Sequence, residues 1–231
     1  MQTASTDRNF QKLLRAASWM QLLPKTAADR VVEDAFETSH DTKDVVARKG
    51  EPVHSWVGVA EGLLKVSAVT HAGRVVMFTG VPQRCWVGEG SVIKFEMRRY
   101  DITAMRPSRV IHIPRATFHW LLDTNLDFNH FIIAHLNERV GQFIAMTEAS
   151  RSVEPVKRVA TAIFCLFNPV LYAGAGPLLQ ISQEEIGELA GLSRPTANQT
   201  IKELQERGLV RAEYGSLLVL DLEGLRSIKE S

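Results

Sequence analysis

Hydrophobic and polar positions alternate with different periods in different parts of the chain. Residues 10–36 and 127–151 carry apolar side chains at helical spacing. Between them, from Ser39 to Pro114, short β-branched stretches alternate with glycines, and turn signals recur about every ten residues. This texture is typical of an all-β barrel or jelly roll. The sequence therefore predicts an α+β fold, with an N-terminal β-roll (jelly roll), a long helix and a C-terminal helical domain.

Turn and loop signals divide these regions further. Pro24 interrupts the first helical pattern, which predicts a short helix, a turn at Leu23–Lys25 and a second helix. A short helix is also expected over Thr117–Leu122, and the polar segment Ser150–Pro155 is the best domain boundary. The expected parts are 1–125 (helices and β-roll), 126–152 (long helix) and 153–231 (C-terminal domain). The glycines expected in turns are Gly50, Gly62, Gly73, Gly88 and Gly90.

Residues Ile181–Val210 have the pattern of two short helices joined by a tight turn. Ser182 and Glu185 have the spacing of a capping box at the start of the first helix. Gly191 breaks that helix and can adopt the positive φ that a sharp turn needs. Ser193 can cap the second helix. The segment after it predicts a hairpin that turns at Tyr214–Ser216, so the whole is a winged helix-turn-helix.

An ordinary helical hairpin packed into a core would show the same spacing, but the polar residue types favour a DNA-binding surface. Arginine, asparagine and glutamine pair with the edges of guanine and adenine, whereas hydroxyls and lysine suit phosphates. The candidates for reading bases are Arg194, Asn198 and Gln199. The candidates for contacting phosphates are Ser193, Thr196 and Lys202.

The long helical segment Asp127–Arg151 is apolar on more than one side. One face can pack on the β-domain while another pairs with a second copy of the chain, as in a coiled coil. A plain core helix is the alternative. The predicted dimer interface consists of Ile132, Leu136, Phe143 and Met146.

Composition sets broad limits on the function. The chain has 231 residues, of which 45% are hydrophobic and 23% charged, as in a globular protein. Its formal net charge is only +1, so any positive DNA-binding stripe must be local. Cys85 and Cys165 are far apart and suit buried thiols in a reducing compartment. Since neither a signal peptide nor a membrane-spanning run is evident, the expected location is the cytoplasm, away from membranes.

Histidines offer only weak candidates for metal or haem chemistry. His54, His71 and His112 lie on the predicted sheet, but no His-x-His pair with a following carboxylate suggests a cupin-type metal site. Neither a metal site nor catalytic residues can be assembled, so an enzyme is disfavoured. A haem or redox sensor stays open as an alternative input to a regulator, with His54, His71 and His135 as possible ligands.

The β-roll, the long helix and the winged helix-turn-helix together resemble the Crp/Fnr superfamily of bacterial transcription regulators, relatives of the cyclic-AMP receptor protein. The resemblance runs from about Phe10 to Leu220, and its most specific part is ISQEEIGELAGLSRPTANQTIKELQERGLV. It implies a homodimer that binds a two-fold site in double-stranded DNA. It also implies RNA polymerase as a partner and a small-molecule effector in the β-roll.

The same resemblance implies roles for individual residues of the second helix. Arg194 falls where the family places a base-reading arginine. Gln199 stands where many members have a second such arginine, and Pro195 where many have a base-reading glutamate. These two departures mean that the family's usual half-site should not be assumed.

The resemblance implies an effector pocket that departs from the family's cyclic-nucleotide binders. Gly88 and Glu89 match the start of their phosphate cassette, but Arg98 and Arg99 align with its end without the usual serine. Phe143 and Ile144 align with the hydroxyl residues that meet adenine, and they form no hydrogen bonds. An effector other than cyclic AMP is therefore expected, with an apolar or aromatic molecule favoured over no ligand at all. A cyclic-nucleotide-responsive regulator is the alternative, and no cofactor is assigned.

Overall fold

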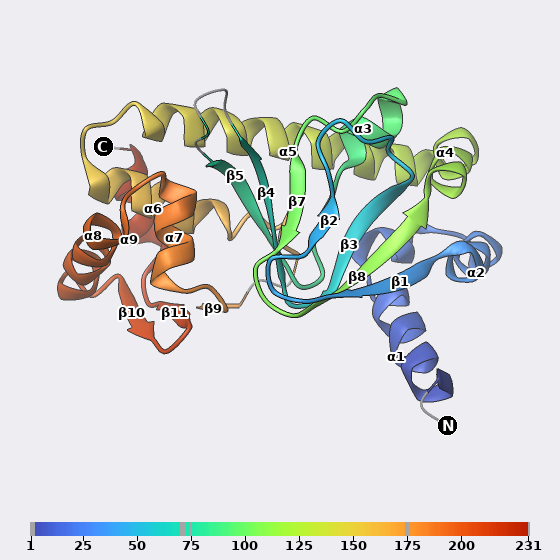
Figure 1. The fold of residues 1–231 in the computed structure, drawn as a ribbon, viewed down its shortest axis with the longest axis horizontal. Helices are drawn as coiled ribbons and strands as arrows, with labels where there is room; N and C mark the ends of the chain where they lie inside the picture. The colour runs from blue at the N-terminus through green and yellow to red at the C-terminus, as the bar shows by residue number, and fades with distance from the viewer. Residues whose placement is uncertain (1–2, 70–72, 74, 174–175, 231) are drawn as a thin grey trace. The chain divides into compact units, whose positions relative to one another are not determined.

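The computed structural model describes residues 3–69, 73, 75–173 and 176–230 (Figure 1). The chain divides into two compact units. The first comprises Met1–Ala68 and Gly80–Asn137, and the second comprises Val69–Thr79 and Glu138–Ser231. Helices and antiparallel sheets occur in this one chain, which confirms the predicted α+β class.

The first unit begins with helices, as the apolar spacing predicted. They are α1 (Thr3–Arg15), the 3₁₀ helix η1 (Ser18–Leu22) and α2 (Lys25–Asp34). Pro24 separates η1 from α2, and Leu23 before it is extended, as the residue preceding a proline prefers. The predicted turn at this proline is confirmed.

Two four-stranded sheets form the predicted β-roll. One has the strand order β1-β8-β3-β6 and the other β2-β7-β4-β5. The strands are β1 (Phe36–His40), β2 (Val45–Ala47), β3 (Ser55–Glu61), β4 (Leu63–Val69), β5 (Val75–Pro82), β6 (Trp86–Val87), β7 (Asp101–Ala104) and β8 (Ser108–Pro114). The helices of this region are α3 (Glu89–Lys94) and α4 (Arg115–Thr124), and the latter contains the helix expected over Thr117–Leu122.

Glycines make several of the β-roll turns, with one exception. Gly50, Gly62, Gly73 and Gly88 have positive φ, as turn residues were expected to have. At Gly62, between β3 and β4, a Cβ atom would lie 2.7 Å from the Pro107 carbonyl oxygen, so a side chain there would clash. Gly90 was wrongly expected in a turn. It lies inside α3, because the left-handed residue that begins this helix is Gly88.

Aromatic side chains form the centre of the first unit's core. Trp19, in η1, is fully buried, and its ring centroid lies 5.2 Å from those of both Trp56 and Trp86. Phe118 and Phe128 pack edge-on against Trp56 from α4 and from the long helix. Large aromatic rings of this kind dominate core stability, so the N-terminal segment is an integral part of this unit.

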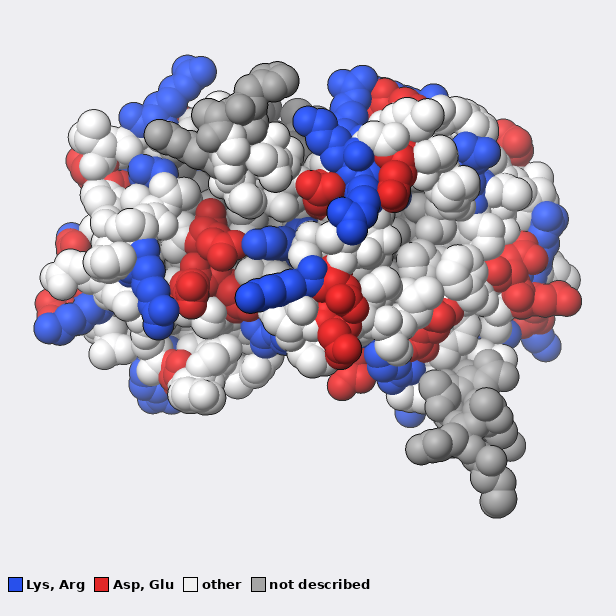
Figure 2. Space-filling view, in the orientation of Figure 1, with Lys and Arg blue, Asp and Glu red and all other residues white. Residues whose placement is uncertain are grey.

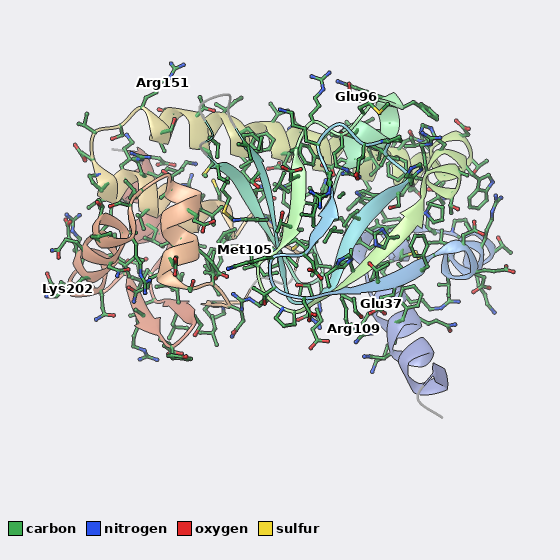
Figure 3. All side chains as sticks on the ribbon, in the orientation of Figure 1. Glu37, Glu96, Met105, Arg109, Arg151 and Lys202 are labelled. Atoms are coloured by element: carbon green, nitrogen blue, oxygen red, sulfur yellow. The ribbon has the colours of Figure 1, made fainter. Side chains whose placement is uncertain are left out.

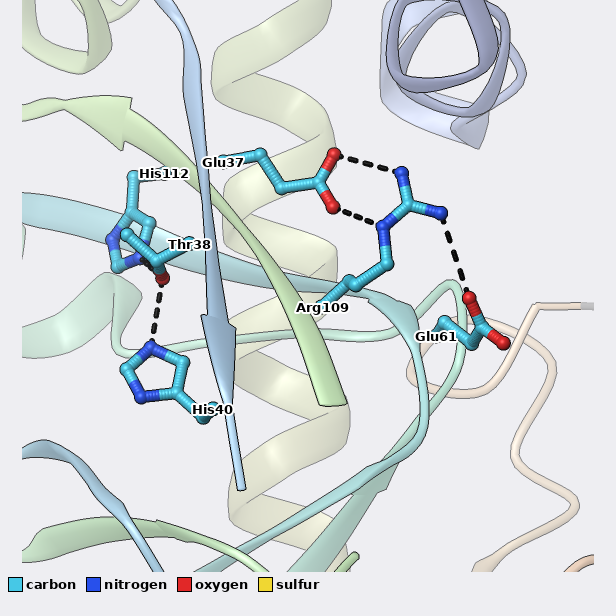
Figure 4. Close-up of polar contacts among 6 residues, drawn as sticks. All are labelled: Glu37, Thr38, His40, Glu61, Arg109 and His112. Carbon is cyan, nitrogen blue, oxygen red and sulfur yellow. Dashed lines mark hydrogen bonds and ion pairs between the residues drawn. The ribbon is translucent and has the colours of Figure 1, made fainter. Parts of the chain in front are cut away.

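The sheet that contains β1, β8 and β3 carries two polar clusters on neighbouring positions (Figure 4). Arg109 on β8 makes a bidentate ion pair with Glu37 on β1 and approaches Glu61 on β3 at 3.5 Å. His112 is buried and hydrogen-bonded through both ring nitrogens, to Ser55 and to Thr38, at 2.9 Å each. Both clusters join strands that are distant in sequence.

The long helix α5 (Leu126–Ser150) and the C-terminal elements follow. They are α6 (Pro155–Cys165), β9 (Leu178–Leu179), α7 (Gln183–Ala190), α8 (Arg194–Glu206), β10 (Val210–Glu213), β11 (Ser216–Val219) and α9 (Leu222–Glu230). Helix α6 packs against α7, α8 and α9. Strands β10 and β11 form the predicted hairpin, and β9 adds a third strand that the sequence pattern did not indicate.

A buried polar network connects separate segments of the second unit. The hydroxyls of Thr79 and Tyr172 are hydrogen-bonded at 2.7 Å. Gln142 on α5 donates to the Tyr172 hydroxyl at 2.8 Å, and Arg139 donates to Gln142 at 3.0 Å. Because buried polar groups need partners, this network fixes the positions of all three segments.

We expect the stability of the fold to fall with pH below neutrality through His112. Burial, together with the neighbouring His40 and Arg98, lowers the pKa of His112 from 6.5 to about 4. Between these two pH values His112 is protonated in the unfolded chain but not in the folded chain. Its contribution to the free energy of unfolding is therefore fully present above about pH 6.5 and falls as pH drops toward 4. Urea unfolding should show a loss of about 2 kcal/mol between about pH 7.5 and about pH 5 from this group.

Replacement His112→Gln should remove this part of the pH dependence, whatever its effect on stability at neutral pH. His54→Gln is the matched control, because His54 is exposed and should leave the slope unchanged. The same slope in the wild-type and His112→Gln proteins would contradict the assignment.

Candidate functional site

The two helices of the helix-turn-helix are capped as the sequence predicted. The Ser182 hydroxyl accepts from the Glu185 N–H at 3.2 Å, and the Glu185 carboxylate accepts from the Ser182 N–H at 2.6 Å. Gly191 ends α7 in the left-handed conformation. Ser193 caps α8 through the N–H of Thr196. These local bonds begin and end both helices at fixed residues.

Two further contacts set the position of α8 against α7, and the sequence analysis missed both. A Cβ atom at Gly187 would lie 2.9 Å from the Cβ of Ala197, so only glycine allows the helices to approach this closely. Arg158 on α6 donates to the carbonyl oxygens of Ala190 and Gly191 at 3.0 and 2.7 Å. These are the carbonyls at the end of α7, and an arginine there stabilises the turn.

Helix α8 buries one face and leaves the predicted DNA-binding residues on the other. Its buried residues are Ala197, Thr200, Ile201 and Leu204. Its exposed residues include Arg194, Asn198, Gln199 and Lys202. Figure 3 shows Lys202 directed outward from α8. Ser193 is also exposed, and its hydroxyl is hydrogen-bonded to that of the half-buried Thr196 at 2.8 Å.

A surface groove brings the start of α8 together with the start of α7 and the tip of the hairpin. Its lining residues are Ser182, Gln183, Glu184, Arg194, Asn198, Glu213, Tyr214 and Gly215. Tyr214 is fully exposed at the hairpin tip, and Glu184 lies 3.6 Å from Arg194 as an ion pair. Glu184 is not evident from the sequence as a site residue, because nothing in the spacing along the chain places it beside Arg194.

A second candidate site lies in the first unit, where α3 begins. Glu89 is buried and pairs with the imidazole of His135 on α5 at 3.3 Å. Arg98 is also buried, and a Cβ at Gly88 would lie 3.2 Å from its Nη1. That nitrogen has no hydrogen-bond partner among the described residues. Burial lowers the pKa of Arg98, against the opposing effect of Tyr100.

The residues predicted for the effector pocket do not all lie beside Glu89. The α5 residue that meets Glu89 is His135, whereas Phe143 and Ile144 lie about 12 Å further along the helix at 1.5 Å per residue. They also belong to the second unit. Arg99 is exposed and paired with Glu96 at 2.8 Å, so of the two arginines only Arg98 is buried. The α5 residue beside Glu89 is therefore polar rather than apolar.

The exposed face of α5 differs from the predicted dimer interface. Ile132 is only 2% exposed and so is not available to a second subunit, whereas Leu136 is half-buried against the same core. Met146 is half-buried and Phe143 lies at the edge of the exposed face. The apolar residues that are open to solvent follow a different stripe: Ile133, Val140 and Ile144, at 64%, 55% and 62% exposure.

Among the described residues, the candidate metal and haem ligands do not form a cluster. His54 is exposed, His112 is bonded to two hydroxyls and His135 is bonded to Glu89, while His71 lies outside the described residues. Within the described ranges there is no group of three or more His, Cys, Asp or Glu side chains that could hold a metal ion. Cys85 and Cys165 are buried free thiols, as predicted. None of the described helices has the length and apolar character that crossing a membrane requires.

Two family models match the chain. A model of the cyclic nucleotide-binding domain matches residues 37–125, and a model of the Crp-like helix-turn-helix domain matches residues 157–228. Together they contain both candidate sites, apart from the α5 residue His135.

Curated relatives and solved structures agree with these matches. The transcriptional regulator SdrP of Thermus thermophilus is 26% identical over 175 residues, covering 75% of this chain and 83% of the relative. The cAMP-activated global transcriptional regulator CRP of Pasteurella multocida is 21% identical over 183 residues, covering 78% and 88%. These relatives are transcription regulators and not enzymes.

Two solved structures have a similar fold. FixK2 from Bradyrhizobium japonicum has a TM-score of 0.71 at 14% identity, covering 85% of this chain and 98% of that chain. A transcriptional regulator of the CRP/FNR family from Thermus thermophilus has a TM-score of 0.60 at 26% identity, covering 85% and 99%.

Proposed function

Because the chain belongs to the Crp/Fnr family of transcription regulators, we propose that it acts as a homodimer on a two-fold symmetric site in double-stranded DNA. The observation that carries this proposal is the exposed polar face of α8 beside the wing hairpin. Residues 1–125 serve as the sensor domain, 126–152 as the dimerisation helix and 153–231 as the DNA-binding domain. RNA polymerase is the partner through which bound protein controls transcription in the cytoplasm.

DNA recognition is assigned to α8 in the major groove. Arg194 begins the helix, and its planar guanidinium matches the O6 and N7 acceptors of guanine. Asn198 and Gln199 lie one turn further along and suit adenine. Ser193, Thr196 and Lys202 contact phosphates and position the helix.

Dimerisation is assigned to the exposed stripe of α5. Ile133, Val140 and Ile144 repeat at intervals of seven and four residues, which is the spacing of a coiled-coil seam. An exposed apolar stripe of this length is unusual on a monomer and indicates an interface. Phe143, which the sequence also placed in the interface, lies at the edge of this stripe and remains part of the proposed interface.

The effector is assigned to the site formed by Gly88, Glu89, Arg98 and His135. A buried guanidinium with an unpartnered nitrogen favours a ligand that carries an anionic group. Cyclic AMP fits poorly, because His135 already engages Glu89, and an exposed Arg99 follows Arg98 in place of a hydroxyl residue. We therefore assign a small anionic effector other than cyclic AMP.

Selection of bound duplexes from a random pool should enrich a palindrome with the wild-type protein. Arg194→Ala should weaken binding to the best site by about 1–3 kcal/mol and relax preference at one base pair in each half-site. Lys202→Ala should weaken binding to all sequences alike and reduce the salt slope by about one per subunit. No enriched palindrome would overturn the main proposal, and an unchanged base preference in Arg194→Ala would make Arg194 a phosphate contact.

The dimer interface can be tested by introducing two glutamates into the exposed stripe of α5. Val140→Glu with Ile144→Glu should weaken dimerisation by about 2 kcal/mol or more, because two carboxylates would be buried in the seam. Sedimentation should then show monomers, with loss of DNA binding. Val153→Glu is the control, since Val153 is an exposed apolar residue beyond the end of α5. A wild-type protein that sediments as a monomer at micromolar concentration would refute the interface.

Isothermal titration calorimetry with cyclic AMP should detect no micromolar binding to the wild-type protein. The assignment would be wrong if such binding occurred and was lost in Arg98→Ala but kept in Arg99→Ala. Arg99 is the matched control, because it carries the same charge in an exposed ion pair one residue away.

A further inference from the structure

The proposed DNA-binding domain does not carry a positive surface charge. Residues 155–230 contain eight Lys and Arg against nine Asp and Glu, a formal net charge of −1. On the face shown in Figure 2, blue and red side chains lie interspersed over the C-terminal elements. Attraction to phosphates is the usual source of sequence-independent affinity, so this domain is poorly equipped for it.

The described cations on α8 and the hairpin also have carboxylate partners. Arg194 pairs with Glu184 at 3.6 Å, Lys202 with Glu206 at 3.9 Å and Arg211 with Glu213 at 3.3 Å. Arg207 pairs with Glu203. Each of these positive charges is partly compensated before DNA arrives, because an intramolecular carboxylate competes with phosphate for the same cation.

One of these pairs differs from the others in its geometry. Glu206 and Glu213 belong to the same helix or strand as their cations, and Glu203 lies in the helix that Arg207 directly follows. Glu184, in contrast, reaches Arg194 from α7. Both side chains line the groove below the hairpin tip. Glu185, its neighbour, is held in the capping box, so Glu184 is not needed to cap α7.

The fold does not depend on this pair. The side chains of Arg194 and Glu184 are 70% and 59% exposed, and ion pairs between such exposed groups contribute little to stability. The main electrostatic effect of the Glu184 carboxylate is therefore on molecules that approach the groove. A polyanion is repelled by it, whereas the edge of a base pair carries no net charge.

We propose that Glu184 is a specificity-determining residue of the DNA-binding surface, which restrains Arg194 from phosphates while leaving it free to bind a base edge. This inference rests on the proposed function. If Arg194 moves to a phosphate, the DNA releases one counterion. The Glu184 carboxylate then loses its partner and binds a cation from solution, so the net release of ions is close to zero. If Arg194 binds a guanine edge, its guanidinium has five N–H donors and can stay beside Glu184. Glu184 thus weakens non-specific binding more than specific binding.

The test compares Glu184→Gln with Glu230→Gln. Glu230 supplies the control, because its loss changes the net charge equally and breaks an ion pair with Arg226 on α9, outside the groove. Affinity for the selected palindrome and for a scrambled duplex is measured over a range of salt concentrations. Thermal unfolding checks that each variant is folded.

Glu184→Gln should raise affinity for the scrambled duplex about five- to tenfold per subunit at 0.1 M salt and steepen its salt slope by about 0.9 per subunit. Affinity for the palindrome should change by less than about twofold, so the specificity ratio falls. Glu230→Gln should leave that ratio unchanged. Adding Arg194→Ala to Glu184→Gln should abolish the gain on the scrambled duplex, because the gain acts through Arg194.

Two results would overturn the proposal, and they differ in what else they overturn. If the wild-type protein enriches no palindrome, both the proposed function and the role of Glu184 fail. If it does enrich one, but Glu184→Gln behaves as Glu230→Gln or strengthens both duplexes equally, only the role of Glu184 fails.

Discussion

The close approach of α7 and α8 at Gly187 and Ala197 constrains everything that the C-terminal domain presents to a partner. With a side chain at residue 187, α8 would have to move away from α7, and the exposed face that begins at Arg194 would rotate with it. Arg158 on α6 stabilises the same arrangement by donating hydrogen bonds to the carbonyl oxygens at the turn between α7 and α8. The pairing of Glu184 with Arg194 across two helices is a consequence of this spacing.

The candidate site of the first unit differs from the α8 surface, because its polar and ionisable side chains are buried. Glu89, Arg98 and His135 are all nearly inaccessible to water. Removing charges from water is expensive unless they are paired, so a site of this kind holds its groups in a strict arrangement. A ligand that brings an anionic group to Arg98 would therefore meet a guanidinium that is already fixed in position among buried polar groups.

Local signals were sufficient to predict the helix-turn-helix and the existence of the long helix α5, but not which faces of α5 are buried. Ser182, Glu185 and Gly191 define helix ends through bonds within a few residues, which the sequence displays directly. On α5, Ile132 and Ile133 are adjacent and equally apolar, and only tertiary packing decides that one is buried and the other exposed. Tertiary packing likewise determines that His135, about two turns before Phe143 on α5, is the residue that meets Glu89. The prediction of a turn at Gly90 was wrong because the turn lies at Gly88, directly before the short helix that contains Gly90.

The aromatic core has a spectroscopic consequence. All four tryptophans of the chain, at positions 19, 56, 86 and 120, belong to the first unit, and three of them lie with ring centroids 4.4–5.2 Å apart. Rings at this distance exchange excitation energy and report on each other's surroundings. The near-ultraviolet emission of this protein is therefore an intrinsic optical probe of the first unit alone, because the C-terminal domain contains no tryptophan.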